Sequence, residues 1–457
     1  METRTMTLTK PMGPTMDWTG TQPLSALSNR AQTSVATCPG SVVRHADKDD
    51  DYHPDTNPQG LCELDVAENL LMRDHLLQHI ERHYPVRLSS QSLTYPNGGA
   101  GSQRLKAAMA RFLNRSWNPI RAIEPRHLIL TNGVSTALEQ LAWGLLDPGD
   151  GILLAQPYYG NLIAHVSLRV GATVVPVSFE PSIDPFSLSA VSAYRLALTT
   201  WEQTTGKRVR AILLCHPHNP LGRCYAPNMI KALMQLCQEH QMHLISDEIY
   251  SLSEWENPID NVPPNPFQSV TTINTDGIID PHRVHVLWGL SKDFGANGLR
   301  VAAIVSQSNR QLHSALGRLS WYSFVAGPSD MAATSLLEDD EFTTHYLQLN
   351  SQRMRVAFVT AARSLKENRI PYRPGPHAGV FLWIDLGTRF CELHPREKSV
   401  GLLDLNREIS ERLEAQKVML APGELFGAQT PGWFRLVFTH PEWYLEEALR
   451  RIVVALS

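Results

Sequence analysis

A lysine, an aspartate and an asparagine each follow a short apolar segment of this 457-residue chain. Lys292 stands in HVLWGLSKDFGANGLR (His285–Arg300), where an apolar run gives way to polar sequence punctuated by glycine. Asp247 closes the segment HLISD, and Asn219 comes shortly after RAILLC. In a parallel sheet the carboxyl ends of neighbouring strands lie at one edge, where ligands bind. The sequence therefore predicts that these three side chains share one pocket.

Those residue types suit one particular cofactor, pyridoxal phosphate (PLP). A lysine can hold the aldehyde of this cofactor through a Schiff base. The cofactor also needs a carboxylate opposite its ring nitrogen, which keeps the ring able to accept electrons from the substrate α-carbon. A pocket that also holds a tyrosine and an arginine could supply partners for the ring and for the phosphate.

The elements that must position these residues alternate between strand and helix. Short apolar segments between residues 127 and 306 are typical of buried strands, and helical patterns separate several of them. This alternation indicates an α/β unit with a largely parallel sheet. The strand segments are HLILT (127–131), GILLAQ (151–156), ATVVPVSF (172–179), RAILLCHP (210–217), HLISDEIY (243–250), RVHVLWGLS (283–291) and LRVAAIVS (299–306).

The chain divides into four stretches by composition and pattern. Residues 1–55 are rich in Thr, Ser, Pro and Gly and end near the acidic run DKDDD, which predicts a disordered tail. Residues 56–90 are expected to pack with a small domain, and residues 91–325 to form the large cofactor-binding α/β domain. Residues 326–457 read as helices followed by the strand-like GVFLWIDL and WFRLVFTH, which predicts a smaller α+β domain.

Composition excludes several classes of protein. The net charge of −4 offers no basic surface for nucleic acid, and no apolar run reaches the roughly 18 residues of a membrane helix. The six cysteines form no CxxC pair, which predicts neither a zinc site nor a disulfide framework and favours a reducing, cytoplasmic location. His216 and His218 have no third ligand at metal-site spacing, so we expect no metal.

Several motifs resemble those of fold-type I PLP enzymes. HNPLGR (His218–Arg223), SDEIY (Ser246–Tyr250) and LSKDFGANGLR (Leu290–Arg300) resemble signature segments of class I and II aminotransferases. The resemblance implies a PLP-dependent transferase fold, with a largely parallel seven-stranded type of sheet between helices and a smaller α+β domain. Three further stretches are similar to 1-aminocyclopropane-1-carboxylate (ACC) synthases: NPQGLCELDVAENLL (57–71), PYYG (157–160) and PGWFRLVFTH (431–440).

The resemblance implies a role for each matching position around the cofactor ring. Lys292 matches the lysine that binds the cofactor and moves protons at the substrate α-carbon. Asp247 matches the partner of the ring nitrogen. Tyr250 and Asn219 match the two groups that hydrogen-bond the ring hydroxyl, and Tyr159 matches the aromatic residue that stacks on the ring.

The same resemblance implies a phosphate cradle and a substrate clamp. The cradle is the turn that opens a helix, where backbone N–H groups suit an anion, and further phosphate ligands come from nearby side chains. Tyr95 matches a tyrosine that reaches the phosphate of the neighbouring subunit, which implies a homodimer with shared active sites. Arg435 matches the arginine that binds the substrate carboxylate, and Glu68 matches a substrate-pocket position. The implied phosphate ligands are Gly133, Val134, Ser135, Ser291, Arg300 and Tyr95.

One position and one segment depart from the family pattern. Gly289 stands where the family usually has a serine that binds the phosphate, so Ser291, Ser135 or backbone groups must compensate. SLTYPNGGAG (92–101) replaces the QDY-H-G pattern of ACC synthases, which speaks against S-adenosylmethionine as substrate. This variant pattern resembles a fungal branch found in secondary metabolism, which includes carbon–sulfur lyases of epidithiodiketopiperazine pathways and proteins known simply as aminotransferases.

We therefore expect a PLP-dependent enzyme that acts at the α-carbon of an amino-acid-like substrate, foremost a carbon–sulfur lyase that works by β-elimination. An aminotransferase with a 2-oxo acid acceptor is the alternative, because both reactions use the same core residues. ACC synthesis from S-adenosylmethionine and a non-catalytic regulator with the same fold are further alternatives. The complete set of catalytic residue types argues against the regulator.

Overall fold

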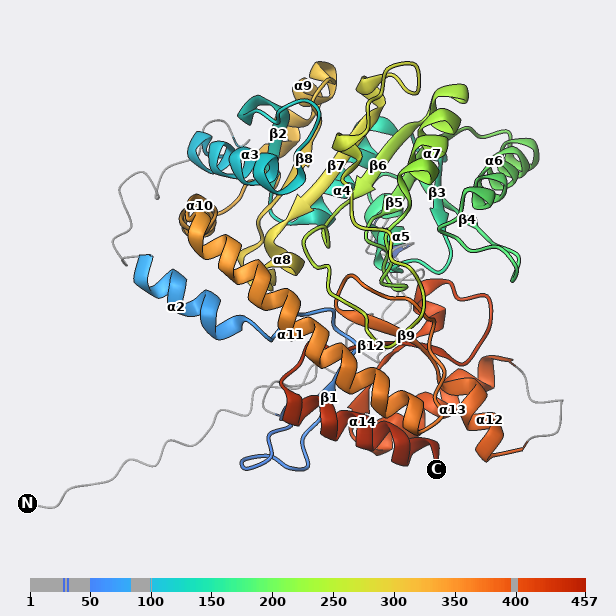
Figure 1. Ribbon diagram of the computed structural model, residues 1–457. Helices are drawn as coiled ribbons and strands as arrows, with labels where there is room; N and C mark the ends of the chain where they lie inside the picture. Colours follow the sequence, from blue (N-terminus) through green and yellow to red (C-terminus); the bar gives the residue numbers. More distant parts are fainter. Residues whose placement is uncertain (1–27, 29–30, 33–49, 84–98, 100, 396–401) are drawn as a thin grey trace, which may run out of the picture. The chain divides into compact units, whose positions relative to one another are not determined.

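A seven-stranded sheet forms the centre of the larger part of the described structure, drawn at the top of Figure 1. The computed structural model describes residues 28, 31–32, 50–83, 99, 101–395 and 402–457. The strand order of this sheet is β2-β8-β7-β6-β5-β3-β4. The strand β8 is antiparallel to both of its neighbours, and the other pairs are parallel. The predicted fold class is confirmed. The strands are β2 (Leu128–Thr131), β3 (Gly151–Ala155), β4 (Thr173–Val177), β5 (Val209–Cys215), β6 (His243–Asp247), β7 (Val284–Gly289) and β8 (Ala302–Val305).

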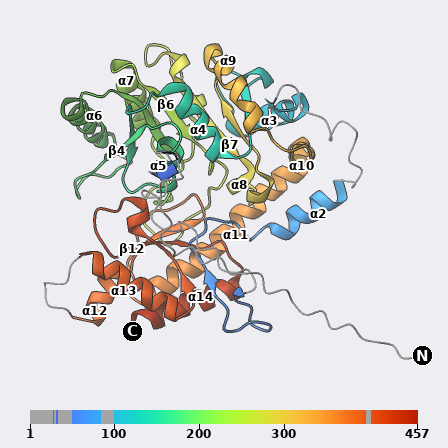
Figure 2. The ribbon, with the colours of Figure 1, turned by 180° about the vertical axis from the view of Figure 1, so that it is seen from behind.

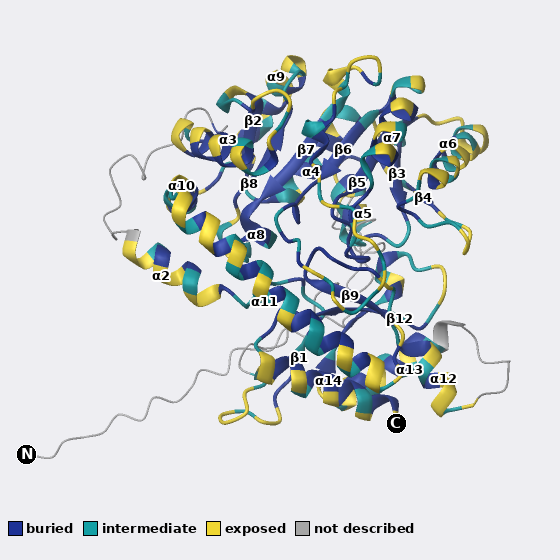
Figure 3. Cartoon of the chain, viewed as in Figure 1, coloured by how far each residue is buried: buried dark blue, intermediate teal, exposed yellow. Residues whose placement is uncertain are grey.

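The middle strands are buried along almost their whole length because both of their faces are covered. Figure 3 shows β5, β6 and β7 in the colour of buried residues. On one face, Ile212, Leu244 and Val286 pack against α3 (Gln103–Trp117), α6 (Val191–Thr205) and α7 (Pro227–Glu239). The alternate residues of the same strands face the opposite way, as the two-residue period of a strand requires.

That opposite face is covered by α4 (Val134–Leu145), α5 (Asn161–Ser167) and α9 (Arg310–Leu319), which come forward in the view from behind (Figure 2). The remaining helical elements of this part are short or peripheral. They are α8 (Leu290–Asp293), α10 (Gly327–Glu338), η5 (Pro125–His127), η6 (Leu188–Ala190), η7 (Val270–Thr272), η8 (Pro281–Arg283), η9 (Asn297–Leu299) and η10 (Ser320–Tyr322).

A second, smaller core lies around an antiparallel sheet of order β11-β12-β9. Residues near the start of the described chain belong to this core, because Leu64 accepts a backbone hydrogen bond from Val437 and donates one to Met419. The elements are β1 (Cys62–Glu63), α11 (Asp340–Glu367), β9 (Phe381–Asp385), α12 (Leu386–Leu393), α13 (Leu402–Ala415), β10 (Val418–Met419), β11 (Ala421–Pro422), η11 (Gly423–Phe426), β12 (Trp433–Val437) and α14 (Glu442–Leu456). The helix α2 (Arg73–His83) instead packs with the larger core, next to α10.

The described residues include the end of the acidic run DKDDD, which the sequence analysis assigns to the tail. Asp50 forms an ion pair with Lys417, and Asp51 forms a β-bridge with Leu61. Residues 44–457 form one compact unit, and the limits of the four predicted stretches stay predictions. Among the described helices, none is both long enough and apolar enough to cross a membrane.

Candidate functional site

The carboxyl ends of three adjacent strands carry the polar residues that the sequence singled out. Asp247 ends β6 and lies in register between Cys215 of β5 and Leu287 of β7, so the three strands end at the same level. Asn219 follows β5, and Lys292 lies in α8 directly after β7. The strand order therefore brings these side chains to one edge of the sheet.

Lys292 is half-buried at this edge, and its Nζ donates a hydrogen bond to the carbonyl oxygen of Ala67. Burial, together with the positive charges of Arg435 and Arg300, lowers the pKa of the Lys292 amine to about 8. The negative charges of Glu68 and Asp247 oppose this shift. About a tenth of the amine is thus neutral at pH 7, far more than in an ordinary lysine, and the neutral form is the one that acts as a nucleophile or a base.

Asp247 is buried, and its Oδ1 accepts a hydrogen bond of 3.3 Å from the N–H of Ile249. Burial raises the pKa of this carboxyl group to about 7, although the Ile249 hydrogen bond and the charge of Lys292 act in the opposite direction. A positive charge bound beside the carboxylate would restore its ionised form. The environment of Asp247 therefore fits a protonated ring nitrogen.

Arg435 is a buried cation whose two hydrogen bonds go to uncharged oxygen atoms. It lies on β12, the central strand of the small sheet, and its Nη1 donates 3.2 Å to Oδ1 of Asn219. Its Nη2 donates to the carbonyl oxygen of Asp65, whose negative charge also acts on it, while its Nε has no hydrogen-bond partner. A buried charge in this state is costly unless an anion completes its contacts. The guanidinium is thus available for a carboxylate, with the rings of Phe426, Phe381 and Tyr159 at 4.8, 5.6 and 5.9 Å.

Two tyrosines accompany these residues. Tyr250 is buried, and its ring meets the edge of Phe381 at a centroid distance of 5.3 Å. Tyr159 is half-buried, and its hydroxyl accepts a hydrogen bond of 2.7 Å from Asn161. Tyr158 instead packs into the core beside α4 and α5. The different burial of the adjacent tyrosines favours Tyr159 as the ring that reaches a ligand.

The start of α4 forms an anion cradle. Gly133 precedes the helix with φ of +112°, a region that suits glycine, and no side chain caps the helix. The Arg300 guanidinium lies so close to Gly133 that a Cβ at that position would come within 2.1 Å of Nη2. Uncapped N–H groups, the helix dipole and a guanidinium together suit a phosphate. Val134 opens the helix, and Ser135 is exposed in its first turn.

The surroundings of Gly289 explain why glycine stands where the family usually has a serine, and Ser291 is the nearby serine that could replace it. Ser291 is buried, and no hydrogen bond joins it to the α4 turn among the described residues. Gly289 pairs with Ala302 of β8, and a Cβ at Gly289 would lie 2.7 Å from the Val301 carbonyl oxygen and 2.8 Å from the Ala302 Cβ. The close approach of β8 therefore accounts for glycine where a serine was expected.

A segment from the start of the described chain covers the lysine. Besides the Ala67 contact, a Cβ at Gly295 would lie 2.6 Å from the carbonyl oxygen of Asn69. Glu68 is partly exposed; its Oε1 accepts a hydrogen bond of 3.2 Å from Asn297, and its Oε2 pairs with Arg73 at 3.2 Å. The charge of Glu68 acts on the Lys292 amine, and its role in the substrate pocket stays a prediction. Tyr95 lies outside the described residues.

Asp293 is a buried residue of the site that the sequence reasoning missed. Its carboxylate accepts four hydrogen bonds, from the hydroxyl groups of Ser251 and Ser253, the N–H of Leu252 and the indole N–H of Trp288. These bonds tie α8 to the loop after β6 and so fix the backbone of Lys292. The only signal in the sequence is an aspartate beside the lysine, and its partners are visible only once the strands are paired.

Comparison with known proteins agrees with the resemblance that the sequence motifs showed. The sequence pattern of the family described as "Aminotransferase class I and II" matches residues 61–452. The chain is 33% identical over 394 residues to "Probable aminotransferase gliI" of Aspergillus fumigatus, covering 85% of this chain and 87% of that protein. It is 32% identical over 433 residues to "Probable aminotransferase sirI" of Leptosphaeria maculans, covering 94% and 98%.

A mouse protein and two solved structures extend the similarity. The chain is 30% identical over 414 residues to "Probable inactive 1-aminocyclopropane-1-carboxylate synthase-like protein 2" of Mus musculus, covering 89% of this chain and 68% of that protein. A Thermus thermophilus aspartate aminotransferase double mutant shares the fold with a TM-score of 0.68 at 23% identity, covering 86% and 91%. An aromatic aminotransferase from Pyrococcus horikoshii does so with a TM-score of 0.69 at 20% identity, covering 87% and 95%.

Proposed function

The chain belongs to the family of class I and II aminotransferases and is a PLP-dependent enzyme, and on that premise we propose that it is a carbon–sulfur lyase that acts by β-elimination. Its substrate is an amino-acid-like molecule with a single carboxylate and a sulfur substituent on the β-carbon. We also propose a place in secondary metabolism, because the pattern at residues 92–101 resembles the fungal branch described above. We propose a cytoplasmic location and a homodimer in which Tyr95 reaches the partner's site.

The charges around Lys292 carry this proposal. Among the described residues, the positive charges that act on its amine are those of Arg435 and Arg300. Arg300 lies at the anion cradle with Gly133, so Arg435 is the cation left for the substrate. One buried guanidinium matches one carboxylate. A dicarboxylic 2-oxo acid acceptor, which a typical transamination cycle would bind, needs a second cation in the pocket.

Several residues would hold the cofactor in the site. The α4 turn and Arg300 would bind the phosphate, with Ser291 close by in sequence to Lys292. Asn219 and Tyr250 would hydrogen-bond the ring hydroxyl, and Tyr159 would stack on the ring. Asp247 would face the ring nitrogen. The bound cofactor supplies an electron sink for the pair that is left at the substrate α-carbon when a proton departs.

Different side chains of the protein then bind the substrate and transfer its proton. Arg435 holds the substrate carboxylate, which orients the bond from the α-carbon to its hydrogen. Lys292 takes the α-proton through Nζ, and its lowered pKa keeps part of the amine neutral for this step. Asp247 would be kept ionised by a protonated ring nitrogen bound beside it, despite the raised pKa of its carboxyl group. Glu68 adds negative charge near Lys292 and lies at the entrance of the substrate pocket.

The β-elimination outcome balances without any second substrate. The α-proton passes to Lys292, the carbon–sulfur bond breaks with its electron pair on sulfur, and the thiol leaves after it takes up a proton. Water then converts the remaining three-carbon fragment of a cysteine conjugate to pyruvate and ammonia. No oxidant or reductant is needed.

A screen of cysteine conjugates with and without added 2-oxo acid tests this proposal. A lyase releases thiol, pyruvate and ammonia in equal amounts when no 2-oxo acid is present. Turnover that depends on an added 2-oxo acid, with the amino group recovered on that acid, would overturn the lyase assignment.

Transamination is the second candidate. It is supported by the printed names of fungal relatives, which are called probable aminotransferases. In transamination, Lys292 would deliver the proton to a carbon atom of the cofactor. The β-substituent would then stay on the substrate. The same screen separates the two reactions.

A further inference from the structure

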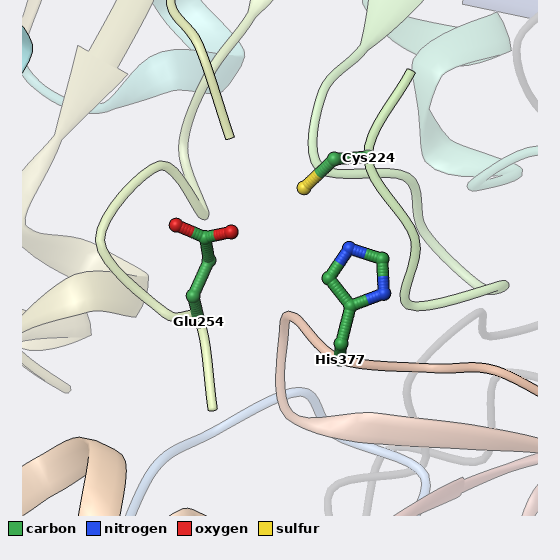
Figure 4. Close-up of side chains that lie close together, drawn as sticks. All are labelled: Cys224, Glu254 and His377. Carbon is green, nitrogen blue, oxygen red and sulfur yellow. The ribbon is translucent and has the colours of Figure 1, made fainter. Parts of the chain in front are cut away.

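Three side chains from distant parts of the chain converge beneath the site loops. Cys224 follows β5, Glu254 follows β6, and His377 precedes β9. One sulfur, one carboxylate oxygen and one ring nitrogen of these residues lie within 4.8 Å of one another. Figure 4 shows the three side chains pointing into one space. Cys224 and His377 are buried and Glu254 is partly buried.

The backbone around these side chains is firmly bonded. The N–H groups of His377 and Ala378 both donate to the carbonyl oxygen of Gly222, at 2.8 and 3.0 Å. Glu254 forms a β-bridge with Ala378, and Trp255 donates 2.9 Å to the carbonyl oxygen of His377. Three loops are thus joined where the three side chains meet.

Each ring nitrogen of His377 faces a carbonyl oxygen, although a neutral ring can donate only one hydrogen bond. Its Nδ1 lies 3.1 Å from the carbonyl oxygen of Gly375, and its Nε2 lies 3.0 Å from that of Asn265. Burial lowers the pKa of His377, which favours the neutral ring. A neutral imidazole carries one N–H, so one of its nitrogens must face a carbonyl oxygen with a lone pair. A cation at that nitrogen would remove the conflict, while the other N–H donates to a carbonyl as metal-bound histidines usually do.

We propose that Cys224, Glu254 and His377 bind a zinc ion. Thiolate, carboxylate and imidazole are the ligands that zinc takes in proteins, and its bond lengths place tetrahedral ligand atoms about 3.3–3.7 Å apart. The present spacing needs a contraction of roughly 1 Å, which side-chain rotation supplies. The Asn265 carbonyl oxygen, 3.0 Å from Nε2, is in place as an oxygen donor for the fourth position. Binding releases the thiol proton of Cys224.

The location predicts a structural role for this ion. Cys224 lies on the same loop as Asn219, and Glu254 lies on the loop that follows Tyr250. The ion would tie both loops to the segment before β9 without touching the residues that hold the cofactor. Its loss is therefore expected to lower thermal stability more than it changes cofactor binding. This inference stands independently of whether the enzyme is a lyase or an aminotransferase.

Metal analysis of the purified holoenzyme tests the proposal. After expression with added zinc and dialysis, the wild type should retain about one zinc ion per chain, and Cys224→Ser and His377→Ala should retain almost none. Cys237→Ser is the matched control, because Cys237 is also a buried free cysteine but lies in α7 away from the cluster. It should bind zinc like the wild type.

Cobalt gives a second measurement that does not depend on any variant. Replacement of zinc by Co²⁺ in the wild-type holoenzyme should produce the absorption bands of a tetrahedral thiolate-bound ion at wavelengths beyond those of the cofactor. Zinc absent from the wild type together with no such cobalt bands would overturn the proposal. Zinc retained in full by a folded Cys224→Ser variant would overturn it as well.

Discussion

The guanidinium of Arg300 occupies the space that a side chain at Gly133 would need. A Cβ on Gly133 would come within 2.1 Å of Nη2, and the backbone there has φ of +112°. The two residues are far apart in sequence, yet each position depends on the other. Together they form the anion cradle at the start of α4.

Gly133→Ala should therefore weaken cofactor binding. The new methyl group strains the backbone and displaces Arg300, which costs about 1–3 kcal/mol and lowers PLP affinity roughly tenfold to a hundredfold. Titration of the cofactor-free protein with PLP measures the change. Gly317→Ala is the control, because a Cβ there meets nothing within 4 Å. Equal affinities for both variants would contradict the proposed cradle.

The reactivity of Lys292 should follow its lowered pKa. Its amine is mostly protonated below pH 8 and neutral above it, so attachment of PLP should speed up about tenfold per pH unit below this value and level off above it. Borohydride trapping at timed intervals, with peptide mapping, measures the rate at each pH. A label on a different lysine would disprove the assignment.

Asp247→Asn should abolish most of the chemistry at the α-carbon without unfolding the protein. The amide cannot keep the ring nitrogen charged, so exchange of the substrate α-proton should slow by a factor on the order of 10²–10⁴. Deuterium uptake at the α-carbon, followed by NMR, reports this step directly. Asp276→Asn in an exposed loop serves as the control and should exchange at the wild-type rate.

Arg435→Ala should mainly weaken substrate binding. The lost guanidinium–carboxylate pair corresponds to about 1.5–3 kcal/mol, or roughly a tenfold to hundredfold increase in substrate Kd. Arg435→Lys should recover only part of this, because an ammonium group lacks the two-pronged geometry. The measurement is a spectral titration with substrate. A variant that loses its cofactor would instead indicate a structural role.

Asp293→Asn should destabilise the fold around α8. All four partners of the carboxylate are donors, and the amide would turn an NH₂ group toward some of them. Leaving buried donors unpaired costs about 1–3 kcal/mol in the free energy of unfolding. Urea unfolding measures the loss, with Asp276→Asn as the reference. Unchanged stability would show that the four bonds contribute little.

The sequence predicts much of the fold because the central strands are buried on both faces. β5, β6 and β7 read as short segments rich in apolar residues, so their ends and the residues that follow could be located. The partners of Asp293 could not, since they depend on which loops meet after the strands pair. The same holds for the Cys224 cluster, whose members are separated by 30 and 123 residues and form no motif.

The contact between Gly289 and β8 has an evolutionary consequence. A serine at position 289 would collide with the Val301 carbonyl oxygen as well as the Ala302 side chain. A smaller residue at position 302 relieves only one of these collisions, and the backbone of β8 must move to relieve the other. Reversion to the family's usual serine thus requires coordinated changes rather than one mutation. Strand pairing with β8, rather than phosphate binding, thus determines which residue fits at position 289.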